Sequence, residues 1–519
     1  MTSLTGNSNC VSRVQAENTA FSTGKDDQMH SANVEIQDAP PYNVLAPNRK
    51  VTILFIAGFA AMFSPLSSFI YYPALKNIAR DLHTSVSKVN LTITSYMIVS
   101  GLVPAMWGDL ADQIGRRPVL LAMFTIYIAA NIGLALQTSY PALLTLRMIQ
   151  SLGASATVGI GYGIVSDIYT PAERGQWMFI AACGPNATPA FGPVLGGILA
   201  EKAAWPYIFW FLAGFAFVAL TFIVILYPET GRKIAGNGSI PVSGIHRRLF
   251  DTCIKEHLIS TRDSPATLSR PLRLRVPNPF LSVKLLVKPY NLPIMLIYGI
   301  FYTDYCILQA SLSTLFIEKY HYSTLAAGLI YIPFGAGCFL AALFGGRILS
   351  RDYRATAVKH GWPAVDKVVG DDLMKFPIVE ARLKSMAWVI TVTASCIIPF
   401  GFLLEHEVHP AAPLILQFIL GATTTFVQNV GNTILVDLHP KRPATAQASV
   451  NLIRCSMAGA ALAALQPLIN TIGAGWCFVV FAGLTLSGLI LWWIEMRWAL
   501  EWWRTSAEAR PQCNEFMTR

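Results

Sequence analysis

Charge is the property that this chain has least of. Only 13% of its 519 residues are Asp, Glu, Lys or Arg, about half the share in average soluble proteins, whereas 53% are hydrophobic. The apolar residues gather in runs of about twenty with few charges, a length that suits a bilayer-spanning helix. These runs lack the polar stripe of a soluble helix, so the chain is predicted to cross a membrane repeatedly.

Several motifs of known chemistry are also missing. The chain has no G-x-x-x-x-G-K-[ST] loop for the phosphates of ATP, which disfavours an ATP-driven pump. It has no G-x-S-x-G elbow and no H-E-x-x-H pair, and its nine cysteines form no C-x-x-C pair. Six cysteines lie inside apolar segments, where small packing residues are expected. The sequence therefore predicts no enzyme, no metal and no cofactor.

Twelve apolar segments predict an all-α membrane protein with twelve transmembrane helices. Their ranges are 51–73, 88–107, 119–137, 141–167, 176–200, 205–227, 291–317, 323–348, 383–404, 410–437, 443–470 and 473–497. A polar stretch of about 60 residues, rich in Arg and Pro, separates the sixth segment from the seventh. Six segments, a linker and six segments predict two related halves.

This pattern also gives the expected domain boundaries. Residues 1–48 are rich in Ser, Asn, Asp and Gln, so a disordered cytoplasmic tail is expected there. The remaining units are an N-terminal bundle over 49–227, a cytoplasmic linker over 228–290, a C-terminal bundle over 291–498 and a cytoplasmic tail over 499–519.

Basic residues are distributed unequally between the short connections, and this predicts the orientation. The richer set contains Arg116, Arg117, Arg174, Arg232, Lys233, Arg347, Arg351, Arg354, Lys441 and Arg442, and the poorer set contains Lys76, Arg80, Lys202 and Lys319. Loops rich in Lys and Arg stay in the cytoplasm. Both termini and the linker are therefore expected there, and the net charge of +10 reflects topology rather than nucleic-acid binding.

One cluster of charge interrupts the apolar sequence, the stretch GDLADQIGRRPVLL after the second segment. Its two glycines, Gly108 and Gly115, allow a tight turn and close helix contact. Arg116 and Arg117 fit the orientation rule, but carboxylates contribute little to that rule, so Asp112 needs another explanation. A charged latch between moving parts accounts for both signs of charge.

The stretch resembles the cytoplasmic loop motif of the major facilitator superfamily, G-x-L-A-D-R-x-G-R-K-x-x-L. The matching residues are Gly108, Leu110, Ala111, Asp112, Gly115, Arg116, Arg117 and Leu120. Gln113 replaces a residue that is usually basic, which puts a surface contact in doubt but not the latch. The resemblance implies a gating motif on the cytoplasmic side.

Further motifs follow in the order of that family. LLTLRMIQSLGASA resembles its fourth-span motif, with Arg147 and Gln150 in place and Ser151 where glycine is usual. GPVLGG resembles the antiporter motif of the fifth span, although Thr188 stands where an earlier glycine is usual; the matching residues are Gly192, Pro193, Gly196 and Gly197. PETGR looks like the segment that closes the sixth span in fungal drug:proton antiporters, and ATAQASVNLIRCSMAGAALAALQPLINTIGAGWCF looks like their quinidine-resistance-like branch.

The resemblance implies two six-helix bundles around a central cavity and proton-coupled efflux of drugs or secondary metabolites. The implied partners are hydrophobic or amphipathic small molecules, protons and the lipid bilayer, with no nucleic acid, and a monomer is expected. Uptake of a nutrient or polyamine, and a membrane sensor that does not translocate, are the alternatives. The cell membrane is the expected location, with the vacuolar membrane as the alternative.

Charged and polar residues inside the spans are candidates for proton coupling or substrate binding, since a charge in the bilayer is costly. Arg147 lies about 10 Å into the fourth span at ~1.5 Å per residue, and the family motif implies a role in proton movement, with a structural arginine as the alternative. Asp304 lies near the middle of the seventh span, where a carboxyl group could carry a proton, with a neutral structural acid or one bonded to the backbone as the alternative. Arg454 could pair with Asp304 or line the substrate path. Asn429, beside Gln428 and near Asn432, could line the cavity or bond neighbouring helices.

Aromatic and proline residues complete the expected cavity wall. The aromatic candidates are Tyr71, Tyr96, Tyr302, Tyr305, Phe191 and Phe426, with ordinary packing as the alternative. Pro185, Pro189 and Pro193 are expected to free backbone carbonyls and bend the fifth span. A bent fifth span beside the cavity could act as a pivot or seal.

Overall fold

The computed structural model describes residues 42–242, 244–248, 280–320, 328–361, 376–406, 408–440 and 442–516, and all regular elements among them are helical. The predicted disordered tail lies outside the described residues up to residue 41. Residues from Asn43 onward form one unit, and the description below concerns this unit alone.

The N-terminal half contains helices of different lengths, several of which follow one another with a break of only one or two residues. They are α2 (Pro47–Ala61), α3 (Phe63–Phe69), η1 (Tyr72–Ala74), α4 (Leu75–Asp81), α5 (Val86–Leu102), α6 (Pro104–Ile114), α7 (Arg116–Leu136), α8 (Tyr140–Ala154), α9 (Thr157–Ile168), α10 (Pro171–Ala181), α11 (Cys183–Lys202) and α12 (Pro206–Ile225). Proline occupies the first position of α6, where the missing amide breaks no helical hydrogen bond. Pairs such as α5 with α6 and α8 with α9 each form one membrane span.

The linker and the C-terminal half follow. Helices α13 (Arg232–Ala235), η2 (Gly244–His246) and α14 (Phe280–Leu286) lie in the predicted linker, and α15 (Leu292–Tyr320), α17 (Ile332–Lys359), α18 (Ile378–Leu383), α19 (Met386–Glu405), α20 (Ala411–Leu438) and α21 (Pro443–Phe516) form the second half. Helix α21 contains two spans, because Gly473 breaks it with a φ of 82°. A Cβ atom at Gly473 would lie 2.8 Å from a carboxylate oxygen of Glu405, so both conformation and space favour glycine.

Eleven helical segments of the described chain are long and apolar enough to cross a membrane, and the chain is an all-α membrane protein as predicted. The fifth predicted span is not among the eleven. Helices α10 and α11 occupy it, and α11 carries many Gly and Pro residues and packs against α3 and α17. Pro189 and Pro193 lie inside α11, and Pro185 lies in its first turn, shortly after the break between α10 and α11 at Ala182; the bending role of the three prolines stays a prediction.

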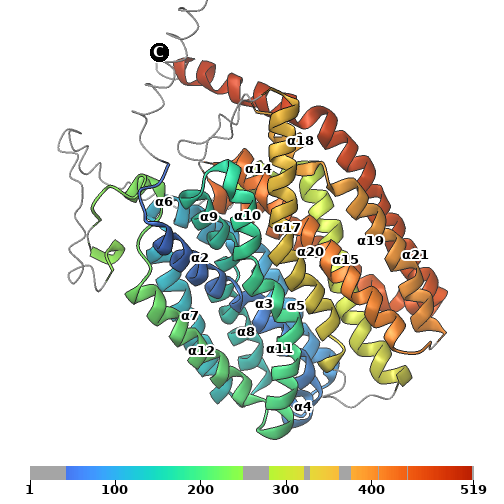
Figure 1. The fold of residues 1–519 in the computed structure, drawn as a ribbon. Coiled ribbons are helices and arrows are strands. Elements are labelled where there is room, and N and C mark those ends of the chain that lie inside the picture. Colours follow the sequence, from blue (N-terminus) through green and yellow to red (C-terminus); the bar gives the residue numbers. More distant parts are fainter. Residues whose placement is uncertain are drawn as a thin grey trace, which may run out of the picture. The chain divides into compact units, whose positions relative to one another are not determined.

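The apolar clusters of the two halves touch, since Val436 joins the N-terminal cluster and Ala172 and Phe179 join a C-terminal one, and the halves meet along two seams. Figure 1 shows the blue-to-green helices on one side of the described unit and the yellow-to-red helices on the other. Helices α10 and α11 contact α17 along one seam, and α5 and α6 contact α21 along the other. Small residues permit this approach: a Cβ atom at Gly335 of α17 would lie 2.3 Å from the Cβ of Ala190 in α11.

Candidate functional site

The turn between α6 and α7 holds a buried ion-pair network at one end of the described unit. Arg116, the first residue of α7, pairs with Asp112 one helical turn earlier, and its Nε lies 3.1 Å from Asp167. All three residues are at most 6% exposed. We name this end, which also carries Arg174 and Arg382, the basic end.

Asp112 also joins the two halves of the protein. Its Oδ2 accepts hydrogen bonds from the Thr445 backbone amide at 3.0 Å and the Thr445 hydroxyl at 2.8 Å. Thr445 lies in the first turn of α21, where helix amides have no intrahelical partner and favour a negative charge. A Cβ atom at Gly108 would lie 2.7 Å from the Ala444 carbonyl oxygen, so glycine permits this contact. The structure thus brings Asp112, Arg116, Asp167 and a helix terminus together; their gating role stays a proposal.

Glu229, from the PETGR segment, caps the start of α7. Its carboxylate accepts hydrogen bonds from the backbone amides of Arg116 at 2.8 Å and Arg117 at 3.1 Å, and from Nδ1 of His246 at 3.1 Å. Burial raises the pKa of Glu229, but these hydrogen bonds outweigh it, so that the pKa lies below its usual value. Gly115 has a φ of 105°, and a Cβ atom there would lie 2.3 Å from Glu229 Oε2.

Arg117 stabilises the packing of α7 against α12, in addition to its expected effect on membrane orientation. Its guanidinium donates to the carbonyl oxygens of Ile223 at 3.0 Å, Val224 at 2.9 Å and Tyr227. The first two carbonyls belong to the last turn of α12, which lacks intrahelical donors, and Tyr227 lies two residues beyond that helix. Arg117 therefore ties α7 to α12 within the N-terminal half.

A second charged cluster crosses the halves at the basic end. Asp437, near the end of α20, pairs with Arg174 of α10 and with Nε of Arg382 in α18 at 2.9 Å. Arg382 Nη2 also donates to the carbonyl oxygen of Pro171 at 2.6 Å. All three charged residues are at most 1% exposed. Arg174 and Asp437 thus connect α10 of the N-terminal half to α20 of the C-terminal half.

Arg147 is fully buried inside the N-terminal half. Its Nη1 donates to the Ser67 carbonyl oxygen at 3.2 Å and to the side chain of Gln150. The guanidinium carbon lies 4.2 Å from the ring centroid of Tyr71 and 4.7 Å from that of Tyr96. Aromatic faces and carbonyls thus stabilise this cation among the described residues, without a carboxylate.

Asp304 faces away from the central cavity. Its Oδ2 accepts a hydrogen bond of 2.8 Å from Thr485 of α21, and its Oδ1 has no partner among the described residues. Tyr302, two residues earlier, lines the cavity, and two residues correspond to about 200° around a helix. For this reason the considered pairing of Asp304 with Arg454 is not present.

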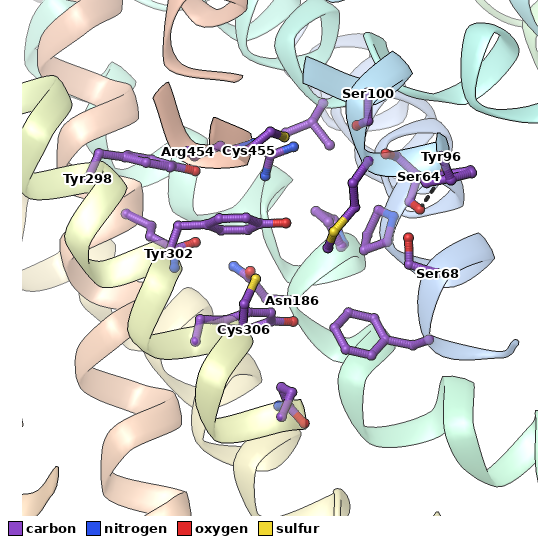
Figure 2. A pocket seen from close by; sticks show the side chains of 18 of the residues that line it. Ser64, Ser68, Tyr96, Ser100, Asn186, Tyr298, Tyr302, Cys306, Arg454 and Cys455 are labelled. Atoms are coloured by element: carbon purple, nitrogen blue, oxygen red, sulfur yellow. Dashed lines mark hydrogen bonds between the residues drawn. The ribbon is translucent and has the colours of Figure 1, made fainter. Parts of the chain in front are cut away.

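A cavity of about 120 Å³ lies between the two halves. Figure 2 shows Tyr298, Tyr302 and Cys306 on one side of it, and Ser64, Ser68, Tyr96 and Ser100 on the other. These sides belong to α15 and to α3 and α5 respectively. Arg454 and Cys455 of α21, Asn186 of α11 and Gln428, Asn429 and Asn432 of α20 also line it.

The expected aromatic wall is only partly present. Tyr96, Tyr302 and Tyr305 line the cavity, and Tyr302 stacks on Tyr305 with ring centroids 5.8 Å apart. The other three candidates pack elsewhere: Tyr71 on Arg147, Phe426 on Phe179, and Phe191 against the N-terminal core. Those packing sites depend on tertiary contacts, which the local sequence does not show.

Sequence reasoning missed several residues of these sites. They are Glu229, Arg382, Asp437, Tyr162 and Tyr298, together with Glu495, which is fully buried with neither carboxylate oxygen partnered in the described part. The spacing of Tyr298, Tyr302 and Tyr305 on one helix face is a signal that could have identified the cavity wall. Glu229, Asp437 and Glu495 could have been identified less easily from the sequence, where each is an isolated acidic residue in or beside an apolar segment.

The chain resembles known proteins both in sequence and in fold. Residues 57–364 match the sequence profile of the Major Facilitator Superfamily. The chain is 36% identical over 474 residues to MFS-type transporter phiD from Fungal sp., covering 90% of this chain and 71% of that protein. It is 34% identical over 478 residues to Citrate exporter 1 from Aspergillus niger, covering 91% and 90%. Its fold is similar, with a TM-score of 0.55 and 17% identity, to the crystal structure of the human organic anion transporter MFSD10 (TETRAN), covering 86% and 100% of the two chains.

Proposed function

Because the chain belongs to the Major Facilitator Superfamily and is a multi-pass secondary transporter, we propose that it exports small organic molecules in exchange for protons. The observation that carries this proposal is the polar and aromatic cavity between the two halves. A site at such an interface can face either side of a membrane when the halves rock against each other. Its relatives include a protein named as an exporter, which supports the outward direction.

The basic end supplies a gate for this cycle. The cross-half connections that close it among the described residues include Asp112 with Thr445, Arg174 with Asp437, and Arg382 with the Pro171 carbonyl. We place this end in the cytoplasm, because it carries the basic connections. Export then requires these contacts to break when substrate enters and to reform when it leaves, as in a two-state element biased by charge pairs.

We assign proton coupling to Asp304 and Arg147, which do not line the substrate cavity. Asp304 is a buried carboxyl group with a hydroxyl partner and no ion pair among the described residues, so that gain or loss of a proton changes its charge without a compensating ion. Arg147 cannot release its proton at physiological pH, so it acts through neighbours such as Tyr96, which reaches the cavity wall. The coupling therefore runs through conformation, not through direct competition at Asp304.

The alternatives are less well supported by the cavity. A polyamine site needs carboxylates, and none of the described residues that line the cavity is acidic. We retain the fungal drug:proton antiporter branch, a monomer and the cell membrane as parts of the proposal, with the vacuolar membrane as the second location.

The proposal is tested in proteoliposomes loaded with radiolabelled citrate. An imposed pH gradient should accelerate citrate release, a protonophore should abolish the acceleration, and ATP should have no effect. Gradient-independent release, or release that needs ATP, contradicts proton-coupled export.

A further inference from the structure

We propose that the cavity selects organic acids through Arg454, which acts as the counter-ion for a substrate carboxylate. This inference rests on the proposed transport function and narrows its substrate class from hydrophobic or amphipathic molecules in general to anions. Three features of the cavity carry it: its charge, its hydrogen-bond donors and the occupancy of its aromatic faces.

The cavity wall is positively charged, because Arg454 is the one charged residue among the described residues that line it. Arg454 is half-buried in the wall, forms no ion pair among the described residues, and its Nε has no hydrogen-bond partner there. No acidic residue is found among the described lining residues. A second cation, Arg147, lies behind Tyr96, whereas Asp304 faces Thr485 on the opposite side of α15. In a low-dielectric site this arrangement attracts an anion and repels a cation.

Side-chain amides add unpaired donors to the same wall. Nδ2 of Asn186, Nε2 of Gln428 and Nδ2 of Asn429 have no partner among the described residues. The carbonyl oxygen of Asn429 accepts a hydrogen bond of 3.0 Å from Tyr162, which leaves the amide nitrogen of Asn429 for a ligand. Buried donors without partners are costly, and the oxygens of a carboxylate would satisfy them.

Aromatic walls also bind organic cations, but the protein's own arginines already lie over two of the rings that line this cavity, those of Tyr302 and Tyr96. The Arg454 guanidinium lies 4.6 Å from the ring centroid of Tyr302, and Tyr305 stacks on the same ring. Arg147 lies 4.7 Å from the ring centroid of Tyr96. A substrate cation would compete with these fixed charges for the rings. A carboxylate would instead meet a guanidinium that its aromatic partner holds in place.

The test is ligand binding to the purified protein in detergent, with three probes that share one skeleton and differ in charge: benzoate, benzylamine and benzyl alcohol. Benzoate should bind at least tenfold more tightly than the other two. Arg454→Gln should remove this preference, and Arg454→Lys should retain part of it, since an ammonium keeps the charge but loses the bidentate geometry. Arg347→Gln, which changes an exposed arginine of α17, should bind as the parent protein does.

The melting temperature of each variant distinguishes loss of binding from loss of folding. If Arg454→Gln does not fold, the selectivity of Arg454→Lys is compared with that of the parent protein instead. Equal binding of the three probes, preference for benzylamine, absence of benzoate binding, or unchanged selectivity in a folded Arg454→Gln protein overturns the inference. Selective benzoate binding without gradient-driven citrate release would instead contradict proton-coupled export and leave the anion site intact.

Discussion

Asp112 accepts two hydrogen bonds from Thr445, a residue 333 positions later in the chain, while its other oxygen pairs with Arg116. One carboxylate thus connects the loop after the second span to the helix that begins the eleventh. An isolated ion pair within the loop would stabilise only the N-terminal half. The contact with Thr445 makes the stability of this ion pair depend on whether the basic end is closed.

Asp112→Asn should therefore reduce transport strongly at normal membrane levels. The substitution removes the charge that both Arg116 and the α21 amide require, and hydrogen bonds to charged groups contribute about 1.5–3 kcal/mol. Thr445→Val, which keeps the amide and removes only the hydroxyl, should have a smaller effect. The measurement is the initial transport rate divided by the amount of protein in the membrane, with Glu201→Gln as the exposed control. A normal transport rate in Asp112→Asn would contradict the proposed role of Asp112 as a latch.

Asp437→Asn should destabilise the protein more than Arg174→Gln. Loss of Asp437 leaves two buried arginines without their carboxylate, whereas loss of Arg174 preserves the pair between Asp437 and Arg382. Breaking a buried pair costs about 3–5 kcal/mol. Melting temperatures in detergent give the order, and the double variant gives the coupling energy. Equal effects of the two single substitutions would contradict the shared role of Asp437.

Asp304→Asn should flatten the pH dependence of transport, and Arg147→Ala should abolish active efflux. Asp304 has a hydroxyl partner and no cation, so protonation changes its charge without a compensating ion. Thr485→Val is the matched control, because it removes the partner and keeps the acid. Transport is measured across a pH series at constant gradient. If Asp304→Asn keeps the parent profile, Asp304 is structural.

Glu229→Gln should lower the melting temperature at neutral pH and have little effect in acid. The folded-state pKa of Glu229 lies below its usual value, so its stabilising effect is present above about pH 4.3, the unfolded value, and is lost as the pH falls through the folded value. Thermal unfolding of both proteins over a pH series measures the difference. A difference that grows on acidification would show that the Glu229 carboxylate does not stabilise the fold.

The fold could be predicted well from the sequence, because all the predicted spans except the fifth coincide with long apolar helices. The family motif around Gly115 could be identified because a short local pattern carries it. The partners of that motif could not: Thr445 and Glu229 are distant from it in sequence, and no local pattern pairs them with Asp112 or Arg116. Asp304 shows the same limit, since its depth was predictable but the side of α15 that it faces depends on how α21 packs.

The most direct test of proton-coupled export is the release of labelled citrate from proteoliposomes under an imposed pH gradient, compared between the parent protein, Asp112→Asn and Arg347→Gln. The account predicts that the gradient accelerates release from the parent and from Arg347→Gln, that a protonophore abolishes the acceleration, and that Asp112→Asn shows little of it. Citrate release that is the same with and without the gradient in the parent protein would contradict the account.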